Sequence, residues 1–196
     1  MPADNSIPYN QRDLVFFDIE SSGLSAEKHE ILDLAAVRIR PDFSRQTHVM
    51  SRRVRMLRPE DAEPKALEVN GYNARDWADA VHVRVALVEF ASVIDPDVML
   101  VGHNAARFDW PFIVEAFRRE QLALPDMKYC LDTASMAWPL VVRGHLDKIN
   151  LETLCARYGV SNYGQHRAMA DVRRTVAVYC KLLGLPQPSF IVGGST

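Results

Sequence analysis

The chain has 196 residues and is 48% hydrophobic, which is enough for one globular domain with its own core. No apolar run reaches the roughly 18 residues that a membrane helix needs, and residues 1–13 lack the basic and apolar regions of a signal peptide, so a cytoplasmic protein is expected. The formal net charge of −2 gives no overall basic field, and the well-separated cysteines Cys130, Cys155 and Cys180 fit neither a zinc site nor a disulfide framework.

Basic residues are nevertheless concentrated in one segment. From Arg38 to Arg58 there are seven arginines and one acid, Asp42, so this segment carries +6 and the rest of the chain −8. Two interpretations stay open. The arginines could guide a polyanion to the protein, or they could protect the exposed edge of a sheet from association.

Turn residues and hydrophobic periodicity divide the first half of the chain into three strands and two helices. Residues 1–12 are expected to form a loose tail. Strands are expected at residues 14–17, 31–39 and 47–57, with Pro41-Asp42 in the turn between the last two. Helices are expected at residues 64–69 and 73–94, where Asn73 can cap the second helix and Asp95-Pro96 ends it.

The second half of the chain alternates strands and helices. Strands are expected at residues 98–101 and 127–131. Helices are expected at residues 108–121, after the cap Asp132, at 151–158 between Asn150 and Gly159, and at 168–183 before Gly184. Residues 185–196 are expected to form a flexible tail. The order β-β-β-α-α-β-α-β-α-α-α predicts an α/β fold, a mixed five-stranded sheet with helices on both faces.

Two carboxylates, Asp18 and Glu20, come at the end of the first strand. Side chains alternate along a strand, so both carboxylates point to the same face and repel each other unless a cation lies between them. Carboxylate oxygens are ligands that suit Mg²⁺ or Mn²⁺. Acidic residues end many strands, so this pair alone does not establish a metal site.

Two further carboxylates stand in the first turns of helices. Asp109 follows the fourth strand and Asp171 begins the last helix, positions where the helix dipole by itself favours an acid. His166 precedes Asp171 by five residues, about 500° of helix rotation, so the two meet more easily if His166 lies on the loop after Gly164. There it could accept a proton from a reacting group, although a surface histidine without a role is the simpler interpretation of His166 alone.

Taken together, these residues predict a nuclease. Four carboxylates come from three distant segments, and the ends of strands and starts of helices gather at one rim of an α/β sheet. Four carboxylates in a small volume require more than one divalent ion, and two ions about 4 Å apart are the usual arrangement for in-line attack on a phosphodiester. The expected ligands of two Mg²⁺ or Mn²⁺ ions are Asp18, Glu20, Asp109 and Asp171.

These segments resemble the three motifs of DnaQ-like, DEDDh-type 3′–5′ exonucleases. Phe17-Asp-Ile-Glu-Ser-Ser-Gly-Leu24 resembles the first motif, with serines in place of the usual paired threonines and isoleucine in place of the usual threonine between the acids. Gly102-His-Asn-Ala-Ala-Arg-Phe-Asp109 resembles the second motif. His166-Arg-Ala-Met-Ala-Asp171 resembles the third, and Arg167 stands where the sister DEDDy group has a tyrosine.

The resemblance runs from about Asp13 to Leu183, which gives an expected exonuclease domain at residues 13–184. Residues 150–158 also resemble the segment before the third motif in the proofreading (epsilon) subunit of bacterial replicative polymerases. The resemblance implies a ribonuclease-H-like fold. It also implies hydrolysis from a free 3′ end, with release of 5′-mononucleotides, and we expect DNA as the substrate, in replication, proofreading or repair.

By this resemblance Asp18 bridges both metal ions, Glu20 and Asp171 complete one metal site, and Asp109 supports the other through water. His166 is the expected general base. The expected substrate-binding residues come from the first two motifs, with Leu24 as a wedge against the terminal base; they are Gly23, Leu24, His103, Asn104 and Phe108. Asp33 and Asp132 are interpreted as structural residues, a polar strand position and a helix cap.

Other functions stay open on the sequence. Some relatives trim RNA, and no residue here indicates whether a 2′-hydroxyl is accepted. A catalytically idle nucleic-acid-binding accessory protein is a further alternative, because fold does not imply activity. The chain ends soon after the last helix, so stable association with a polymerase is not expected. The segment Gln187-Pro-Ser-Phe-Ile191 loosely resembles peptides that bind the sliding clamp, although an ordinary disordered end is the simpler interpretation.

Overall fold

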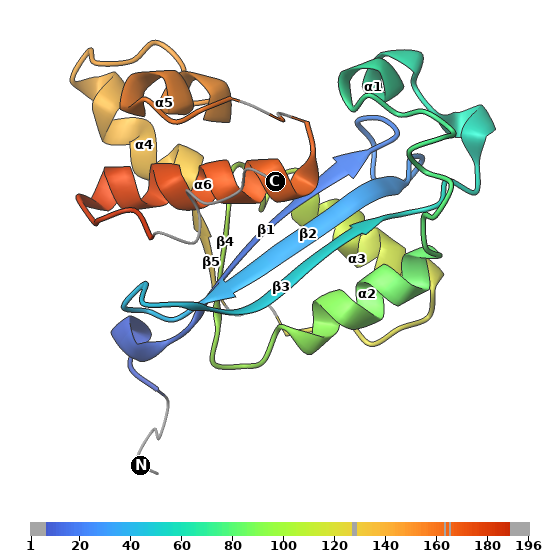
Figure 1. Ribbon diagram of the computed structural model, residues 1–196, viewed down its shortest axis with the longest axis horizontal. Coiled ribbons are helices and arrows are strands. Elements are labelled where there is room, and N and C mark those ends of the chain that lie inside the picture. The colour runs from blue at the N-terminus through green and yellow to red at the C-terminus, as the bar shows by residue number, and fades with distance from the viewer. Residues whose placement is uncertain (1–6, 127–128, 163, 165, 189–196) are drawn as a thin grey trace.

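The computed structural model describes residues 7–126, 129–162, 164 and 166–188. In this part of the chain five strands form one mixed sheet in the order β3-β2-β1-β4-β5 (Figure 1). The bounds of the strands are Leu14–Ser21 for β1, Ile31–Ile39 for β2, Gln46–Arg53 for β3, Met99–Gly102 for β4 and Cys130–Asp132 for β5. The strand β1 lies in the middle, antiparallel to β2 and parallel to β4.

Helices cover both faces of the sheet, as expected (Figure 1). The bounds of the helices are Pro64–Val69 for α1, Val83–Ser92 for α2, Asp109–Arg119 for α3, Thr133–Val142 for α4, Leu151–Tyr158 for α5 and Ala168–Leu183 for α6. The helices α2 and α3 pack on one face, and α6 packs on the other with α4 and α5 behind it. The expected order of elements is therefore confirmed.

The alternation of side chains along β1 divides the core into two layers. Phe17 packs toward α2 and α3, where its ring lies 5.8 Å from that of Phe90. Phe16 packs toward α6, where its ring meets Tyr179 edge-on at 5.4 Å. Both phenylalanines are fully buried, so a shift of register by one residue would exchange the two faces and is strongly disfavoured. This alternation fixes which way the residues at the end of β1 point.

The helix expected at residues 73–94 is the main error in the sequence-based assignment. The helix α2 begins only at Val83, with His82 as its cap, while residues 74–79 form turns and Val81 pairs with Val54 in a β-bridge. Trp77 explains the difference, because its side chain is 6% exposed and its Nε1 donates a 2.9 Å hydrogen bond to the carbonyl oxygen of Leu32. Burying this ring against β2 outweighs the local helical preference of the segment. Asn73 instead accepts a hydrogen bond from the amide of Asp76 within a turn.

The ordered chain begins before β1. Residues 9–11, assigned from the sequence to a loose tail, form a short 3₁₀ helix. Arg12 is 5% exposed, and its guanidinium donates a 3.1 Å hydrogen bond to the carbonyl oxygen of Pro96. The same guanidinium lies 5.3 Å from the ring centroid of Tyr9 and 5.2 Å from that of Tyr129. None of the described helices is both long and apolar enough to cross a bilayer.

The arginine-rich segment lies on and around β3, an edge strand of the sheet. Arg38 is paired with Asp13 and Asp95, and Arg52 is paired with Glu89. Arg40 and Arg58 have carboxylate partners as well. Four of the seven arginines therefore have carboxylate partners within the protein, which leaves less positive charge free to guide a polyanion.

Candidate active site

The register of the sheet places Asp18 and Glu20 on the α6 face of β1. Both follow Leu14 and Phe16 in the alternation that faces this helix. Glu20 is 9% exposed and lies opposite Asp33 of β2. The two expected metal ligands of the first motif therefore share one face at the end of a buried strand.

Asp109 is joined to the same strand by a hydrogen bond. It is the first residue of α3, and it is 3% exposed. Its Oδ1 accepts a 2.9 Å hydrogen bond from the backbone amide of Ile19. This bond spans 90 residues of sequence and fixes the carboxylate of Asp109 beside Asp18 and Glu20.

The third segment brings His166 and Asp171 to the same place. Asp171 stands in the first turn of α6, and His166 lies outside the helix with a φ of 61°. The position expected for His166 on the loop is therefore confirmed. Glu20, His166 and Asp171 can each offer one ligand atom, and these atoms lie within 4.8 Å of one another. That spacing fits a divalent ion, and it also brings the imidazole within reach of such an ion.

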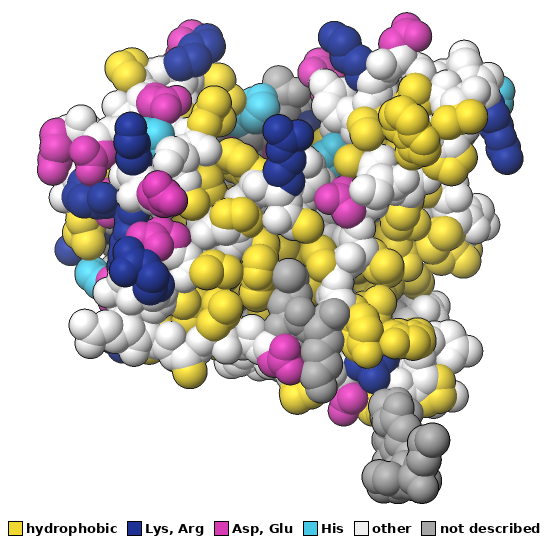
Figure 2. Space-filling model, turned by 180° about the vertical axis from the view of Figure 1, so that it is seen from behind, with side chains coloured by type: hydrophobic (Ala, Val, Ile, Leu, Met, Phe, Trp, Pro, Cys, Tyr) yellow, Lys and Arg dark blue, Asp and Glu magenta, His cyan; other side chains and the backbone are white. Residues whose placement is uncertain are grey.

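A cavity of about 460 Å³ opens in front of these residues. Asp18, Glu20, Asp109, His166 and Asp171 all line it. The remaining lining comes from β1, the turn after β4, the first turn of α4 and the start of α5: Ile19, His103, Asn104, Arg107, Phe108, Ala134, Ile149 and Asn150. Seen from behind, the surface of the molecule is notched between two lobes, and basic and histidine side chains stand at the rim of the notch (Figure 2).

Three of the expected substrate-binding residues line this cavity. His103 is held by a 2.9 Å hydrogen bond between its Nδ1 and the hydroxyl of Thr133, and burial lowers its pKa. Asn104 has a φ of 58° and its amide donates to Oδ1 of Asp132 at 2.9 Å. Phe108 packs on Phe112 with the ring centroids 5.2 Å apart.

The other two, Gly23 and Leu24, lie on the β1–β2 loop outside the cavity lining. Leu24 is 76% exposed, as a wedge for a base would have to be. A Cβ atom at Gly23 would lie 2.5 Å from the ring of His29, so any other residue there would have to displace that ring. His29 in turn accepts a 2.9 Å hydrogen bond from the amide of Ser25.

Burial and mutual repulsion make the carboxylates reluctant to ionise in the metal-free protein. Burial, followed by the charges of Asp109 and Glu20, raises the pKa of Asp18 well above its ordinary range. Burial raises the pKa of Glu20 to about 8 and that of Asp109 to about 7. Burial, together with the charge of Arg174, lowers the pKa of His166. The site therefore combines carboxylates whose charged form a bound cation would stabilise with an imidazole that stays neutral.

Asp33 and Asp132 lie closer to the candidate active site than the sequence suggested. Asp33 is 4% exposed, burial raises its pKa to about 6, and its charge raises the pKa values of Asp18 and Glu20. Only the pairing of β1 with β2 reveals this proximity. Asp132 caps α4 as expected, and the same Oδ1 accepts from the amides of Ala134 and Asn104.

Arg167 and Arg174 also have places that the sequence did not indicate. The guanidinium of Arg167 lies 5.1 Å from the ring centroid of Trp77 and 4.0 Å from Asp33. Arg174 is 6% exposed and forms an ion pair with Asp171. Arg167 stands just before α6 and Arg174 within it, and no local pattern in the sequence indicates these contacts.

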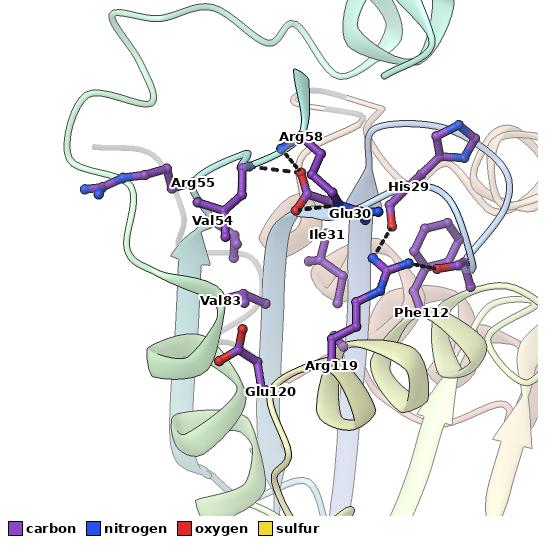
Figure 3. Close-up of a pocket in the computed structure, with 13 residues that line it drawn as sticks. His29, Glu30, Ile31, Val54, Arg55, Arg58, Val83, Phe112, Arg119 and Glu120 are labelled. Carbon is purple, nitrogen blue, oxygen red and sulfur yellow. Dashed lines mark hydrogen bonds and ion pairs between the residues drawn. The ribbon is translucent and has the colours of Figure 1, made fainter. Parts of the chain in front are cut away.

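A second cavity, of about 320 Å³, lies away from the carboxylates between the start of β2, the segment after β3 and the helix α3 (Figure 3). Its lining is largely apolar and includes Ile31, Val54 and Phe112. Arg119 and Glu30 stand at its rim, and both are engaged within the protein: Arg119 donates to the carbonyl oxygen of His29, and Glu30 accepts from the amide of Arg58. No carboxylate of the first cavity lines this one.

Comparison with known proteins agrees with this geometry. The chain is 27% identical over 194 residues to the PolC-type DNA polymerase III of Staphylococcus haemolyticus and 26% identical to that of Staphylococcus aureus. These matches cover 93% of this chain but only 13% of the length of each polymerase.

Solved structures of exonuclease I have the same fold. One superimposes with a TM-score of 0.77 at 21% identity, and the match covers 93% of this chain and 43% of that chain. Escherichia coli exonuclease I in complex with a dT13 oligonucleotide gives a TM-score of 0.76 at 18% identity, with 93% and 43% covered. The expected ribonuclease-H-like fold is thereby confirmed.

A family model decides the relationship. The model of the RNase T family, described as exonuclease, matches residues 15–179, which contain the three segments that form the cavity and most of the described fold. The chain therefore belongs to the RNase T exonuclease family, and the DnaQ-like family expected from its motifs is confirmed.

Proposed function

We propose that this chain is a DEDDh-type 3′–5′ exonuclease that hydrolyses phosphodiester bonds from the 3′ end of DNA and releases 5′-mononucleotides. The observation that carries the proposal is the convergence of Asp18, Glu20, Asp109 and Asp171 with His166 around one cavity. The exonuclease domain spans residues 13–184, slightly more than the 15–179 of the family match. No tyrosine stands four residues before Asp171, which favours the histidine type over the tyrosine type.

The residues fit divalent cations. Four buried or half-buried carboxylates surround the cavity, and the spacing of ligand atoms at Glu20 and Asp171 suits an ion between them. Asp18 would be shared by two Mg²⁺ or Mn²⁺ ions, with Glu20 and Asp171 on one and Asp109 near the other. When bound, such ions stabilise the negative charge that develops on the phosphodiester. The raised pKa values of Glu20 and Asp109 express the same requirement for positive charge.

His166 is the general base in this proposal. Its ring lies near Glu20 and Asp171, and its lowered pKa keeps it neutral at pH 7. A neutral imidazole can take the proton of an attacking water, and its place on a loop outside α6 leaves it room to move toward the reacting group. The backbone amide of His166 lies 3.4 Å from Oδ2 of Asp171, which ties this loop to the metal-binding carboxylate.

The substrate is a single strand or a frayed 3′ end. Phe108 and the imidazole of His103 offer flat surfaces at the cavity, and the exposed Leu24 stands on the neighbouring loop. Stacking on such groups tolerates any base. Exonuclease I, whose fold this chain shares, has been solved with single-stranded DNA. Arg38 of β2 and Arg52 of β3 are already paired with carboxylates of the protein, which argues against a long basic track for a duplex.

Digestion of end-labelled oligonucleotides tests the proposal. Single-stranded DNA, duplex DNA and RNA, each labelled at the 5′ end, are incubated with Mg²⁺ and then with excess EDTA, beside the variant Asp18→Ala. We expect a ladder that shortens from the 3′ end on DNA, strict dependence on the divalent ion and no cleavage by the variant. Preferred cleavage of RNA would favour an RNA-trimming enzyme, and binding without cleavage an accessory protein. Undiminished turnover in EDTA would refute the two-metal mechanism.

A protein partner is a separate question. Exonuclease I has been solved in a complex named for the C-terminal part of SSB, so relatives of this fold do bind partner peptides. Our expectation of a sliding-clamp peptide concerns residues 187–191, and Ser189, Phe190 and Ile191 lie outside the described residues. Titration of a labelled peptide of residues 186–196 with purified clamp tests it, with Phe190→Ala as the control.

A further inference from the structure

Arg174 is a buried arginine beside the carboxylates of the proposed metal site. It lies on α6, one turn after Asp171, and its side chain is 7% exposed. Its Nη2 forms an ion pair with Oδ1 of Asp171, and its Nη1 donates a 3.2 Å hydrogen bond to Oδ1 of Asn162. Its Nε is buried and has no hydrogen-bond partner among the described residues. Arginine is seldom buried unless its charge is compensated.

The compensation comes from the acidic cluster. The groups that raise the pKa of Arg174 against the effect of burial are Cys155, Asp18, Glu20 and Glu152. Conversely, the guanidinium lowers the pKa values of Asp18 and Glu20. Cys155 and Glu152 belong to α5, so the arginine fills the space between α5, α6 and the end of β1. It does not line the cavity, which leaves it behind Asp171 rather than in the path of a substrate.

We infer that Arg174 is a built-in counter-cation: it holds Asp171 and offsets the charge of the carboxylate cluster when no metal is bound, and it thereby limits the affinity of the site for divalent ions. The inference rests on the proposed function. It makes Arg174 a positioning residue for the metal site, not a group that touches substrate. The positive charge of Arg174 repels the ions, but it also stabilises the folded protein when no metal is bound.

Removing the charge of Arg174 has two opposite effects on the affinity for divalent ions. The larger effect decides whether the affinity rises or falls. Without Arg174, Asp171 gains freedom that ion binding must again remove, which weakens binding slightly. The lost repulsion is larger, because a unit charge acts on a divalent ion with twice the energy that it has with a monovalent one. We therefore expect Arg174→Gln to bind Mn²⁺ about tenfold more tightly, on the scale of one pKa unit. Glutamine keeps a hydrogen-bond donor but is shorter and uncharged, so Arg174→Lys is needed to separate the loss of charge from the loss of the guanidinium.

The same loss of charge destabilises the metal-free protein. Four carboxylates would then share the site without Arg174, and they would have to take up protons or repel one another. Bound ions supply the missing positive charge. The melting temperature of Arg174→Gln should therefore fall markedly below that of the parent protein in EDTA, and the gap should close at saturating Mg²⁺.

The experiment measures Mn²⁺ binding by calorimetry without substrate, and melting temperatures in EDTA and in saturating Mg²⁺. The variants are Arg174→Gln, Arg174→Lys, which keeps the charge, and Arg173→Gln, which removes a charge from the half-exposed neighbouring residue. The lysine and Arg173 variants should bind within about twofold of the parent protein, since an exposed charge is screened. A variant Arg174→Gln that is unfolded in EDTA but folded in Mg²⁺ would support the inference in its strongest form.

Three outcomes would overturn the inference. Unchanged Mn²⁺ affinity of Arg174→Gln is the first. The second is a stability loss of equal size with and without Mg²⁺, or a variant unfolded in both, because Arg174 would then support the fold independently of the ions. The third is a parent protein that binds no divalent ion, which would also end the proposed function. The first two outcomes leave that function intact, so the two failures are distinguishable.

Discussion

The backbone amide of Ile19 donates a 2.9 Å hydrogen bond to Oδ1 of Asp109, and this bond joins the central strand to the first turn of α3. The carboxylate of Asp109 thus has two tasks: it satisfies a buried donor of the sheet, and it supplies charge to the proposed metal site. Variants that separate the two tasks provide the first prediction.

Asp109→Asn and Asp109→Ala should both lose cleavage, by about 10²-fold or more, because neither keeps the charge. They should differ in stability. Asparagine keeps an oxygen for the amide of Ile19, whereas alanine leaves that buried donor unpaired at a cost of about 1–3 kcal/mol. Denaturant unfolding in EDTA measures the difference. Equal stability of the two variants would show that the hydrogen bond contributes little.

The metal-free protein should lose stability as pH rises. The pKa of Glu20 is about 8 and that of Asp109 about 7, against ordinary values of 4.5 and 3.8. Above about pH 5 the unfolded chain releases protons that the folded protein retains, so the free energy of unfolding falls until the pH exceeds the folded pKa values. Melting curves in EDTA from pH 5.5 to 8.5 measure this slope.

Two controls accompany that experiment. Saturating Mg²⁺ should flatten the slope, because the ions replace the protons on the carboxylates. Glu20→Gln should reduce the slope in EDTA, since glutamine has no proton to release. A melting temperature in EDTA that stays constant or rises over this pH range would contradict the raised pKa values.

His166→Ala should lower kcat by about 10²–10⁴-fold, the usual loss on removing a general base. In the parent protein the acid limb of the rate profile should lie below the ordinary histidine range, because burial and Arg174 lower the pKa of His166. Rate measurements from pH 5 to 9 and Mn²⁺ calorimetry check both points. One ring nitrogen of His166 lies within 4.8 Å of carboxylate oxygens of Glu20 and Asp171, so a strong loss of Mn²⁺ affinity would make His166 a ligand instead of the base.

Arg119→Ala should loosen the loop that carries Leu24. The guanidinium of Arg119 donates to the carbonyl oxygens of Ala26 and His29, both at 3.2 Å, and so holds the loop against α3 (Figure 3). We expect KM to rise about three- to tenfold, the scale of one or two lost hydrogen bonds, with kcat little changed. Arg118→Ala is the matched control, because Arg118 is 71% exposed and bonds to Glu115. Equal KM values for Arg119→Ala and Arg118→Ala would show that this loop does not contribute to substrate binding.

The most accurate predictions from the sequence are helix boundaries that neighbouring residues determine. The bounds of α5 and α6 were predicted to the residue, because Asn150 caps one helix and Gly159 and Gly184, both with φ of 67°, end the two. The helix expected at residues 73–94 was wrong because Trp77 is buried by β2, a contact that no local pattern contains.

The same distinction applies to the site. The three motif segments could be brought together from the sequence, since strand ends and helix starts meet at one rim of the sheet. Asp33 was interpreted as a polar strand position because its proximity to Glu20 depends on the register of β1 and β2. The partnership of Arg174 with the cluster depends on how α6 is rotated against the sheet, which the packing of Val172 and Val176 decides.

The central position of β1 determines when the carboxylate cluster can assemble during synthesis of the chain. The strand β1 is made before the other described strands and becomes the middle of the sheet, and it is covered by α6, which follows all the other described helices. Asp18 and Glu20 are therefore synthesised about 150 residues before Asp171. A nascent or shortened chain without α6 holds only part of the carboxylate set. The cleavage proposed for this chain would therefore begin only when α6 has docked on the sheet.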